Sequence, residues 1–401
     1  MWNLLCTLIL FLSVSEANNT SAKMDAKALS SSIAHFSAKF CAELEKGKSV
    51  VSSPLSAEFV LALLTLGTTD PAHSELLTAL GIPDDKSIRS SFSEVSSKLK
   101  SLKGVTLKVA NRVYVQEGPY DLEPKLKEDA VKVFDAALEK INFNDGAAAV
   151  GVINKWVENQ TNQKIKDLLS SDSVDSNTRL VLINALYFKG TWKKQFDPEN
   201  TMDQPFHITV NSSVNVPMMY KEDVYLYGES ADLEAQLLEM PYQGEETSML
   251  IVLPTEIEGL DSVMAKLASG FDLMSEVEKM FKTKVQATIP KFKIETEIDL
   301  NELLPKLGIK AIFNQKNSGL TKILNVEEPL YVSKAVQKAF IEVNEEGSEA
   351  AAATAMATRR ARSVPAMFKA NRPALWLVLA GRQVALLASY RPPSASVRDE
   401  L

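Results

Sequence analysis

Three arginines lie within four positions of the chain, at Arg359, Arg360 and Arg362, and Ser363 follows them. A guanidinium stays charged at physiological pH and pairs best with a carboxylate, so an acidic pocket suits it. The run therefore has the chemistry of a bait for a protease that cuts after arginine. A solvated basic turn is the alternative interpretation of the same residues.

The residues before the arginines have different chemistry. Ala350–Ala353 have almost no side chain, so this stretch could enter a packed region without needing a new cavity. Gly347 adds the backbone freedom of a hinge. An alanine-rich helix capped by Asn344 is the alternative, because the two acids at 345 and 346 would suit its first turn.

Three apolar segments are expected at the centre of the protein. Arg179–Trp192 is apolar almost throughout, which predicts a strand covered on both faces. Pro54–Leu66 is apolar on nearly every side, which predicts a buried helix, and Ser53 and Ser56 at its start are then buried hydroxyls that need partners. Such serines are more often helix caps than catalysts. Leu330–Val343 is predicted as a strand that leads directly into the loop.

The remaining periodicity predicts both helices and strands. Spacing of three and four residues indicates helices, among them Lys23–Glu45, Leu126–Leu138 and Ala148–Thr161. Alternation of apolar and polar residues indicates strands, among them Thr106–Gln116 and Pro205–Met219.

Several motifs together resemble one protein family. The central strand carries an Asn-Ala-x-Tyr-Phe-Lys-Gly-x-Trp run, formed by Asn184, Ala185, Tyr187, Phe188, Lys189, Gly190 and Trp192. The Ser53-Pro54-x-Ser56 helix start and the Ser333–Val336 segment before the loop fit the same family. In order and spacing, the chain from Phe36 to Pro393 resembles the serpins, protease inhibitors that trap an enzyme by inserting their own cleaved loop.

The resemblance implies an α+β serpin fold with three β-sheets, about eight or nine helices and an exposed reactive-centre loop. We expect one serpin domain over residues 18–393, with the loop at about 342–370. The resemblance also implies a shutter or breach, where the main sheet opens, at Ser53, Ser56, Asn184 and Trp192. The implied hinge comprises Glu345, Glu346, Gly347, Ser348, Ala350, Ala351, Ala352, Ala353 and Thr354.

The family mechanism requires the loop to be first a substrate and then a strand. A serine endopeptidase forms an acyl-enzyme with the loop, whose N-terminal limb then inserts into the main sheet. If Ser348 points inward, strand alternation also places Ala350, Ala352 and Thr354 inward. The opposite phase would bury Glu349 without a partner, which is costly. The hinge therefore favours a competent inhibitor over the alternative of a non-inhibitory secretory chaperone or carrier.

Two ways of counting place the cut one residue apart. Family spacing of fourteen residues after Gly347 leads to Ala361, whereas counting nine back from Asn371 leads to Arg362. Chemistry favours Arg362, followed by Ser363, because a guanidinium fits an acidic specificity pocket. A cut after Arg360 stays open as a further alternative.

The basic run also has the pattern of a particular protease class. Arg359-Arg360-Ala361-Arg362 fits Arg-x-x-Arg, the minimal pattern of furin-like proprotein convertases. Two arginines three residues apart can engage two acidic pockets, which gives discrimination that one arginine cannot give. A general inhibitor of trypsin-like proteases is the alternative, because a single arginine at the cut is enough for recognition by such a protease.

The composition does not indicate catalysis or nucleic-acid binding. The 401 residues are 24% charged, with a formal net charge of −7, and an acidic chain gives no reason to expect nucleic acid as a partner. His35, His73 and His207 lie in no recognisable catalytic motif, and no cluster has the spacing of metal ligands. We therefore expect no enzyme activity, no metal and no cofactor, but a monomer that forms a covalent complex with a serine endopeptidase.

The two ends of the chain suggest a secretory protein. Trp2–Leu12 is an apolar run too short to span a membrane, and it predicts a signal peptide over residues 1–17. The tail at 394–401 ends in Arg398, Asp399, Glu400 and Leu401, which resemble the Lys-Asp-Glu-Leu retrieval signal of the endoplasmic reticulum. We expect the protein in the endoplasmic reticulum or secreted.

The glycan acceptor sites and the cysteine content are compatible with the secretory pathway. Four asparagines open N-x-Ser/Thr acceptor sites for glycans: Asn18, Asn19, Asn159 and Asn211. Cys6 would leave with the signal peptide, so Cys41 would remain without a partner for an intramolecular disulfide.

Overall fold

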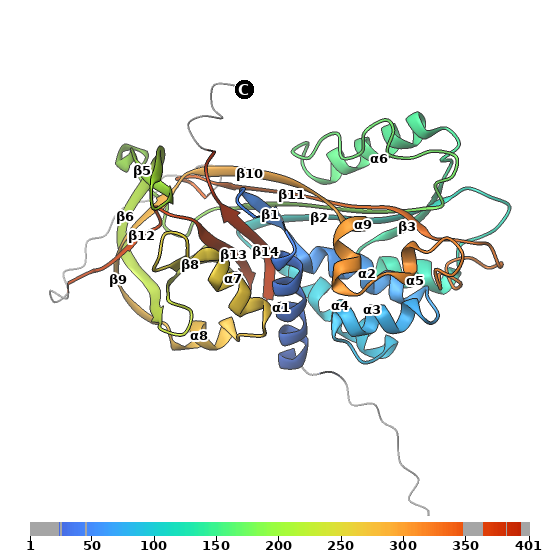
Figure 1. The fold of residues 1–401 in the computed structure, drawn as a ribbon, viewed down its shortest axis with the longest axis horizontal. Coiled ribbons are helices and arrows are strands. Elements are labelled where there is room, and N and C mark those ends of the chain that lie inside the picture. The colour runs from blue at the N-terminus through green and yellow to red at the C-terminus, as the bar shows by residue number, and fades with distance from the viewer. Residues whose placement is uncertain (1–23, 25, 45, 348–363, 382, 394–401) are drawn as a thin grey trace, which may run out of the picture.

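A five-stranded sheet runs along the long axis of the molecule in the computed structural model (Figure 1). The structure describes residues 24, 26–44, 46–347, 364–381 and 383–393. The order of the strands is β10 (Phe292–Asp299), β11 (Val332–Val343), β4 (Leu180–Gly190), β2 (Val105–Gln116) and β3 (Ala137–Ile141). β4 and β11 are parallel, and β4 is buried along almost its whole length, as its apolar sequence predicts.

A second hydrogen-bonded network contains the other nine strands of the described chain. One group of strands is β1 (Val50–Ser52), β14 (Gln383–Tyr390), β13 (Ala374–Ala380), β8 (Thr247–Pro254) and β7 (Ala235–Pro241). The other group is β6 (Ser212–Ser230), β9 (Phe281–Pro290), β12 (Ala366–Lys369) and β5 (Thr201–Thr209). The long β6 joins them, because its second half pairs with β7 and its first half with β5. With the five-stranded sheet, this makes three groups of strands.

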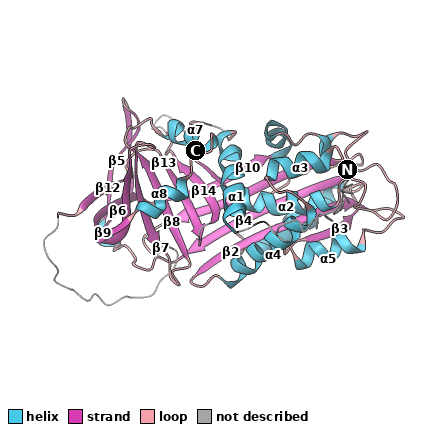
Figure 2. Cartoon of the chain, turned by 90° about the horizontal axis from the view of Figure 1, so that it is seen from below, coloured by secondary structure: helices cyan, strands magenta, loops and turns pink. Residues whose placement is uncertain are grey.

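Helices cover both faces of the five-stranded sheet (Figures 1 and 2). One face carries α2 (Pro54–Leu66), α3 (Ala72–Leu80), α4 (Asp85–Ser101) and α5 (Pro124–Lys132), and the other carries α6 (Gly146–Gln160). The other helices are α1 (Ala26–Ala42), α7 (Leu260–Ala268), α8 (Leu273–Lys279) and α9 (Leu300–Leu303), and three short 3-10 helices are η1 (Pro198–Asn200), η2 (Leu304–Leu307) and η3 (Ala311–Phe313). No helix in the described part of the chain is long and apolar enough to cross a membrane.

The residues of α2 and α6 explain how these two helices pack. Every residue of α2 is buried, and Ser53 caps the helix by accepting a hydrogen bond from the backbone N–H of Ser56. α6 buries Ile153 and Val157 against the sheet. The Arg112 guanidinium of β2 also lies 4.0 Å from the ring centre of Trp156 on α6, a cation–π contact that fastens the helix to the sheet.

Two predicted elements were wrong in extent. The helix predicted over Leu126–Leu138 begins at Pro124 and ends at Lys132, because Ala137 and Leu138 pair with β2 as part of β3. The strand predicted over Pro205–Met219 is two strands, β5 and β6, joined by a turn at residues 210–211. Alternation continues on both sides of so short a turn, so periodicity alone does not reveal it.

Candidate functional site

The predicted reactive loop joins β11 to β12. Its central residues 348–363 lie outside the described residues, and with them Ser348, Ala350, Ala351, Ala352, Ala353, Thr354, Arg359, Arg360, Ala361, Arg362 and Ser363. The signal peptide at 1–17, Asn18, Asn19 and the tail at 394–401 lie outside them as well. The structure describes both attachments of the loop, up to Gly347 and from Val364 onward.

Glu345 anchors the N-terminal attachment of the loop. Its side chain is 9% exposed, with one carboxylate oxygen 2.9 Å from Lys291 Nζ and the other accepting a 2.9 Å hydrogen bond from Thr201 Oγ1. Burial raises the pKa of Glu345, but hydrogen bonds from Lys291, from the residue's own backbone N–H and from Thr201, together with the charge of Lys291, outweigh burial and hold that pKa below its usual value. The backbone carbonyl of Glu345 also accepts a 2.8 Å hydrogen bond from Phe196 N. The hinge thus begins from a fixed charged residue.

Gly347 brings the chain back over the end of β4. Its φ is +78°, and a Cβ there would lie 2.3 Å from Trp192 N and 2.4 Å from Gly190 O, so only glycine fits. Trp192 N donates to the Glu346 carbonyl at 3.1 Å, and the Trp192 indole donates to the Asn344 carbonyl at 2.9 Å. The indole stacks on Tyr242, with ring centres 4.5 Å apart. Trp192 therefore supports the hinge from below.

A buried polar cluster lies under the seam between β4 and β11. Gln337, with 0% exposure, uses both ends of its amide. Its carbonyl accepts from Ser52 Oγ at 2.7 Å and from Ser53 N at 3.0 Å. Its amino group donates to Ser53 O at 2.8 Å and to Asn184 Oδ1 at 2.6 Å. Because Gln337 belongs to β11, Asn184 to β4 and Ser53 to the start of α2, the cluster ties both strands to one helix.

Asn184 extends the cluster toward β2. Its amino group donates to Ser56 Oγ and to Asn111 Oδ1, each at 2.5 Å. The Asn111 amino group is buried without a hydrogen-bond partner among the described residues. Ser53, Ser56 and Asn184 are therefore brought together, whereas Trp192, predicted in the same set, lies apart under the hinge.

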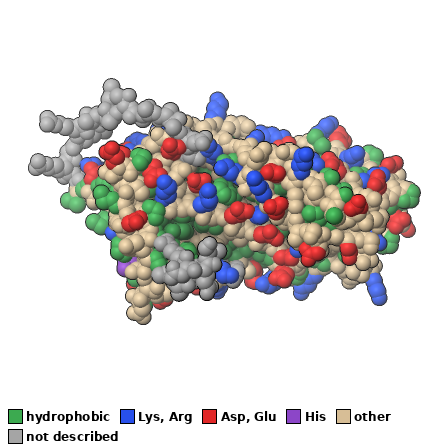
Figure 3. All heavy atoms as spheres, turned by 90° about the horizontal axis from the view of Figure 1, so that it is seen from above, with side chains coloured by type: hydrophobic (Ala, Val, Ile, Leu, Met, Phe, Trp, Pro, Cys, Tyr) green, Lys and Arg blue, Asp and Glu red, His purple; other side chains and the backbone are tan. Residues whose placement is uncertain are grey.

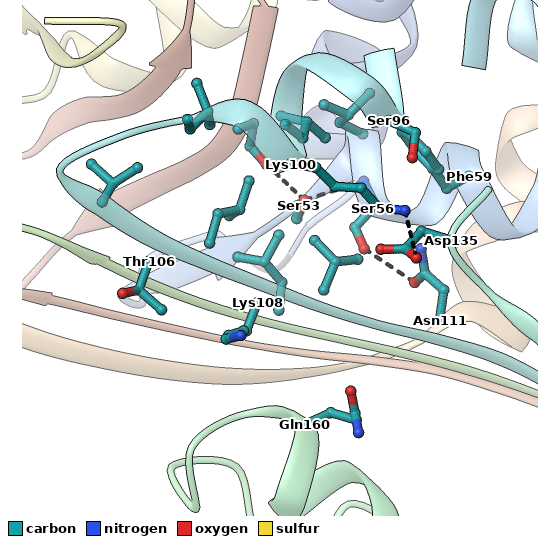
Figure 4. A pocket seen from close by; sticks show the side chains of 18 of the residues that line it. Ser53, Ser56, Phe59, Ser96, Lys100, Thr106, Lys108, Asn111, Asp135 and Gln160 are labelled. Carbon is teal, nitrogen blue, oxygen red and sulfur yellow. Dashed lines mark hydrogen bonds and ion pairs between the residues drawn. The ribbon is translucent and has the colours of Figure 1, made fainter. Parts of the chain in front are cut away.

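A cavity of about 650 Å³ opens beside this cluster (Figure 4). Its lining includes Ser53, Ser56 and Asn111. Lys100 and Asp135, also in the lining, form an ion pair of 2.8 Å. The sheet is thus incompletely packed on the side where α2 meets β2, so displacement of strands there disrupts less packing than in a filled core.

Sequence reasoning missed Gln337, Asn111, Lys291 and Thr201. Gln337 and Asn111 have a detectable signal, because each interrupts the apolar positions of an alternating strand: Asn111 lies between Val109 and Val113, and Gln337 between Ala335 and Ala339. Lys291 and Thr201 have none, since they meet Glu345 only through tertiary structure. No group of acidic, histidine or cysteine side chains in the described ranges could hold a metal ion.

Two predicted glycan acceptors lie on the described surface. Asn159 is exposed near the end of α6, and Asn211 is exposed in the turn between β5 and β6. Both side chains are accessible to modification.

Comparisons with known proteins agree with this arrangement. The family model described as "Serpin (serine protease inhibitor)" matches residues 31–388. The chain is 43% identical to antitrypsin of Bombyx mori over 84% of this chain and 88% of that protein, and 40% identical to alaserpin of Manduca sexta over 82% and 84%. The crystal structure of Serpin48 from the insect Tenebrio molitor superposes with a TM-score of 0.82 at 32% identity, over 92% of this chain and all of that one.

Proposed function

Because the chain belongs to the serpin family of serine protease inhibitors, we propose that it traps furin-like proprotein convertases at the bond between Arg362 and Ser363. The observation that carries the proposal is the position of the hinge. Gly347 turns the chain back directly above the end of β4, next to the parallel seam of β4 and β11. A limb that continues from Gly347 into this seam would run antiparallel to both strands, which is the favoured pairing for an inserted strand.

The reaction then follows in two steps. The protease serine oxygen attacks the Arg362 carbonyl carbon, the bond to Ser363 breaks, and the Ser363 nitrogen leaves with a proton as the new amino terminus. The acyl ester keeps the protease attached to Arg362. Residues 348–358 enter the seam before water hydrolyses that ester. At about 3.3 Å per residue, eleven inserted residues span roughly 36 Å, which carries the protease along the sheet.

The small side chains of the limb support insertion. Gln337 and Asn184 belong to the polar cluster under the seam, and their mutual hydrogen bond must break when β4 and β11 separate. The cavity beside Ser56 lowers the amount of packing that this movement disturbs. Alanine at 350–353 requires no new cavity in the opened seam.

The choice of target depends on Arg359 and Arg362 together. Their spacing fits the Arg-x-x-Arg pattern, and each guanidinium needs its own acidic pocket. The Arg-Asp-Glu-Leu sequence at 398–401 favours a target that acts in the secretory pathway. A trypsin-like target is the second candidate, which the similarity to a protein named antitrypsin favours.

Single substitutions in the loop distinguish a furin-like target from a trypsin-like target. We expect wild-type protein to form a complex with furin and with trypsin that survives denaturing electrophoresis. Arg362→Ala should abolish both complexes, because it removes the side chain that enters the specificity pocket. Arg359→Ala should reduce only the furin complex, by at least about tenfold, since a lost charge-assisted hydrogen bond is worth about 1.5–3 kcal/mol.

Sequencing the released C-terminal fragment locates the cut. A start at Ser363 supports Arg362, whereas a start at Ala361 would identify Arg360 instead. If furin cleaves the wild-type loop and departs without a stable complex, the convertase assignment is wrong. If neither protease is trapped and cleavage of the loop brings no marked rise in thermal stability, the alternative of a non-inhibitory carrier or chaperone is supported.

A further inference from the structure

Exposed apolar side chains gather on the strands beside the C-terminal attachment of the loop. Met367 on β12 is 68% exposed and Val224 on β6 is 51% exposed, while Tyr220 on β6 is 37% exposed. Val364, immediately before β12, is 94% exposed. Figure 3 shows hydrophobic side chains at this end of the molecule. Large apolar side chains concentrated in this way on a soluble protein indicate a contact surface.

Strand register places three of these side chains on one face. Val224 pairs with Lys284, and Tyr220 pairs with Thr288, on the neighbouring β9. Met367 pairs with Gln286, also on β9. Their neighbours on the same strands, Tyr225 and Phe368, are buried, so alternation directs the first set outward. We call the outward face of β6, β9 and β12 the loop-side face.

The charges of the loop-side face are unequal. Glu222 pairs with Lys284 and accepts a 2.8 Å hydrogen bond from Gln286 Nε2, so its negative charge is satisfied within the face. Among the residues that the structure describes, Lys369 forms no ion pair, and Lys282 forms none within 4 Å, although its charge helps to lower the pKa of Glu245, which pairs with Lys193. The face therefore combines apolar side chains with an excess of lysine charge. A partner with an acidic and partly apolar surface would complement it.

The position of the cut identifies such a partner. Ala366, where β12 begins, is only four positions after Arg362, so the two are at most about 14 Å apart. A stable protease–inhibitor interface buries about 800 Å² on each partner and uses roughly 20–30 residues a side, which exceeds what a short loop supplies. A protease that holds arginine in its specificity pockets must also carry carboxylates around them.

We propose that the loop-side face is a second contact surface for the arginine-specific protease bound at the loop. Met367 and Val224 act as apolar anchors, and Lys282 and Lys369 attract the acidic surface of the enzyme. This inference rests on the proposed function and adds a determinant of partner choice outside the loop. A substitution at Val224 distinguishes this second contact from recognition of the loop sequence, because Val224 lies on β6 and not in the loop.

The association rate constant with furin tests the proposal. Val224→Glu and Met367→Glu each introduce a negative charge opposite an acidic enzyme, and each should lower the rate about tenfold. Lys369→Glu should lower the rate and weaken its dependence on salt. The matched control is Val131→Glu, which alters a side chain 63% exposed on α5 at the other end of the molecule and should leave the rate unchanged (Figure 1).

Further readouts separate docking from insertion and folding. The number of inhibitor molecules consumed per trapped protease and the thermal midpoint should match the wild type in all variants. Rates of Val224→Glu and Met367→Glu within twofold of the wild type would overturn the inference and leave the proposed function intact. A lower rate accompanied by greater inhibitor consumption would overturn it too, because insertion would then be the step affected. Failure of the wild type to form any complex would overturn the proposed function and this inference together.

Discussion

Glu58 is a carboxyl group inside the apolar helix α2. Its side chain is 1% exposed, and Oε1 has no hydrogen-bond partner among the described residues. Burial raises the pKa of Glu58 well above its ordinary value, because the charged form loses its hydration without gaining a partner. The native protein therefore holds this proton to higher pH than the unfolded chain does.

The stability of the native state should consequently depend on pH at this residue. Because the folded pKa is raised, the native state binds more protons than the unfolded state above the ordinary pKa of about 4.5, and stability falls as pH rises through that window. Glu58→Gln should remove this pH-dependent loss of stability, because glutamine does not titrate. The stability of the variant relative to the wild type should grow by up to about 1.4 kcal/mol per pH unit until the folded pKa is reached.

Urea unfolding of both proteins at pH 5 and pH 8 measures this difference. A difference of equal size at the two pH values would mean that Glu58 does not titrate differently on folding. The Glu345 carboxyl, whose pKa is lowered, contributes the opposite slope at acid pH and is unchanged in both proteins.

The seam between β4 and β11 is the element on which insertion depends. Gln337 makes four hydrogen bonds there, to Ser52, to Asn184 and to both backbone groups of Ser53. Leucine in Gln337→Leu has a shape similar to that of glutamine but leaves those buried groups unpaired. Each buried group that water cannot reach then costs about 1–3 kcal/mol of unfolding free energy. We expect a loss of at least about 2 kcal/mol in unfolding free energy, scaled from the same penalty.

The same variant should lose inhibitory activity faster during incubation at elevated temperature, since the seam opens more readily. Unfolding in denaturant and timed inhibition assays would measure both effects. Gln315→Leu, at an exposed residue in the loop after η3, is the control and should change neither. Unchanged stability in Gln337→Leu would show that the cluster does not hold the seam together.

The elements that the sequence predicts best are those with long, nearly continuous apolar runs. β4 and α2 are apolar over most of their length, so their burial follows from composition. The contact between Lys291 and Glu345 could not be predicted, because it joins two connecting segments, between β9 and β10 and after β11, whose proximity no local pattern encodes. The end of α5 was missed for a related reason: residues 137–141 become a strand only because β2 is beside them.

At the scale of the whole molecule, the fold places the hinge, the seam and the loop-side face along one path. Glu345 and Gly347 fix the start of the loop at the end of β4, and β12 fixes its other end beside β6 and β9. Cys41 is free and buried, so no disulfide formed by the described residues restrains the sheets. The stability of the molecule depends on packing, which strand insertion can increase.

The central claim is that the cleaved loop becomes a strand of the five-stranded sheet. Its most direct test is the thermal midpoint before and after the loop is cut by a metalloprotease, which forms no ester with the chain and is not trapped. We predict a rise of at least about 10 °C, because ordering and pairing a further strand adds several kcal/mol and each is worth about 2–4 °C in a large domain. Cleaved Ser348→Arg, with a charged side chain at the first inward position, should show no rise. An unchanged or lower midpoint in the cleaved wild-type protein would contradict the account.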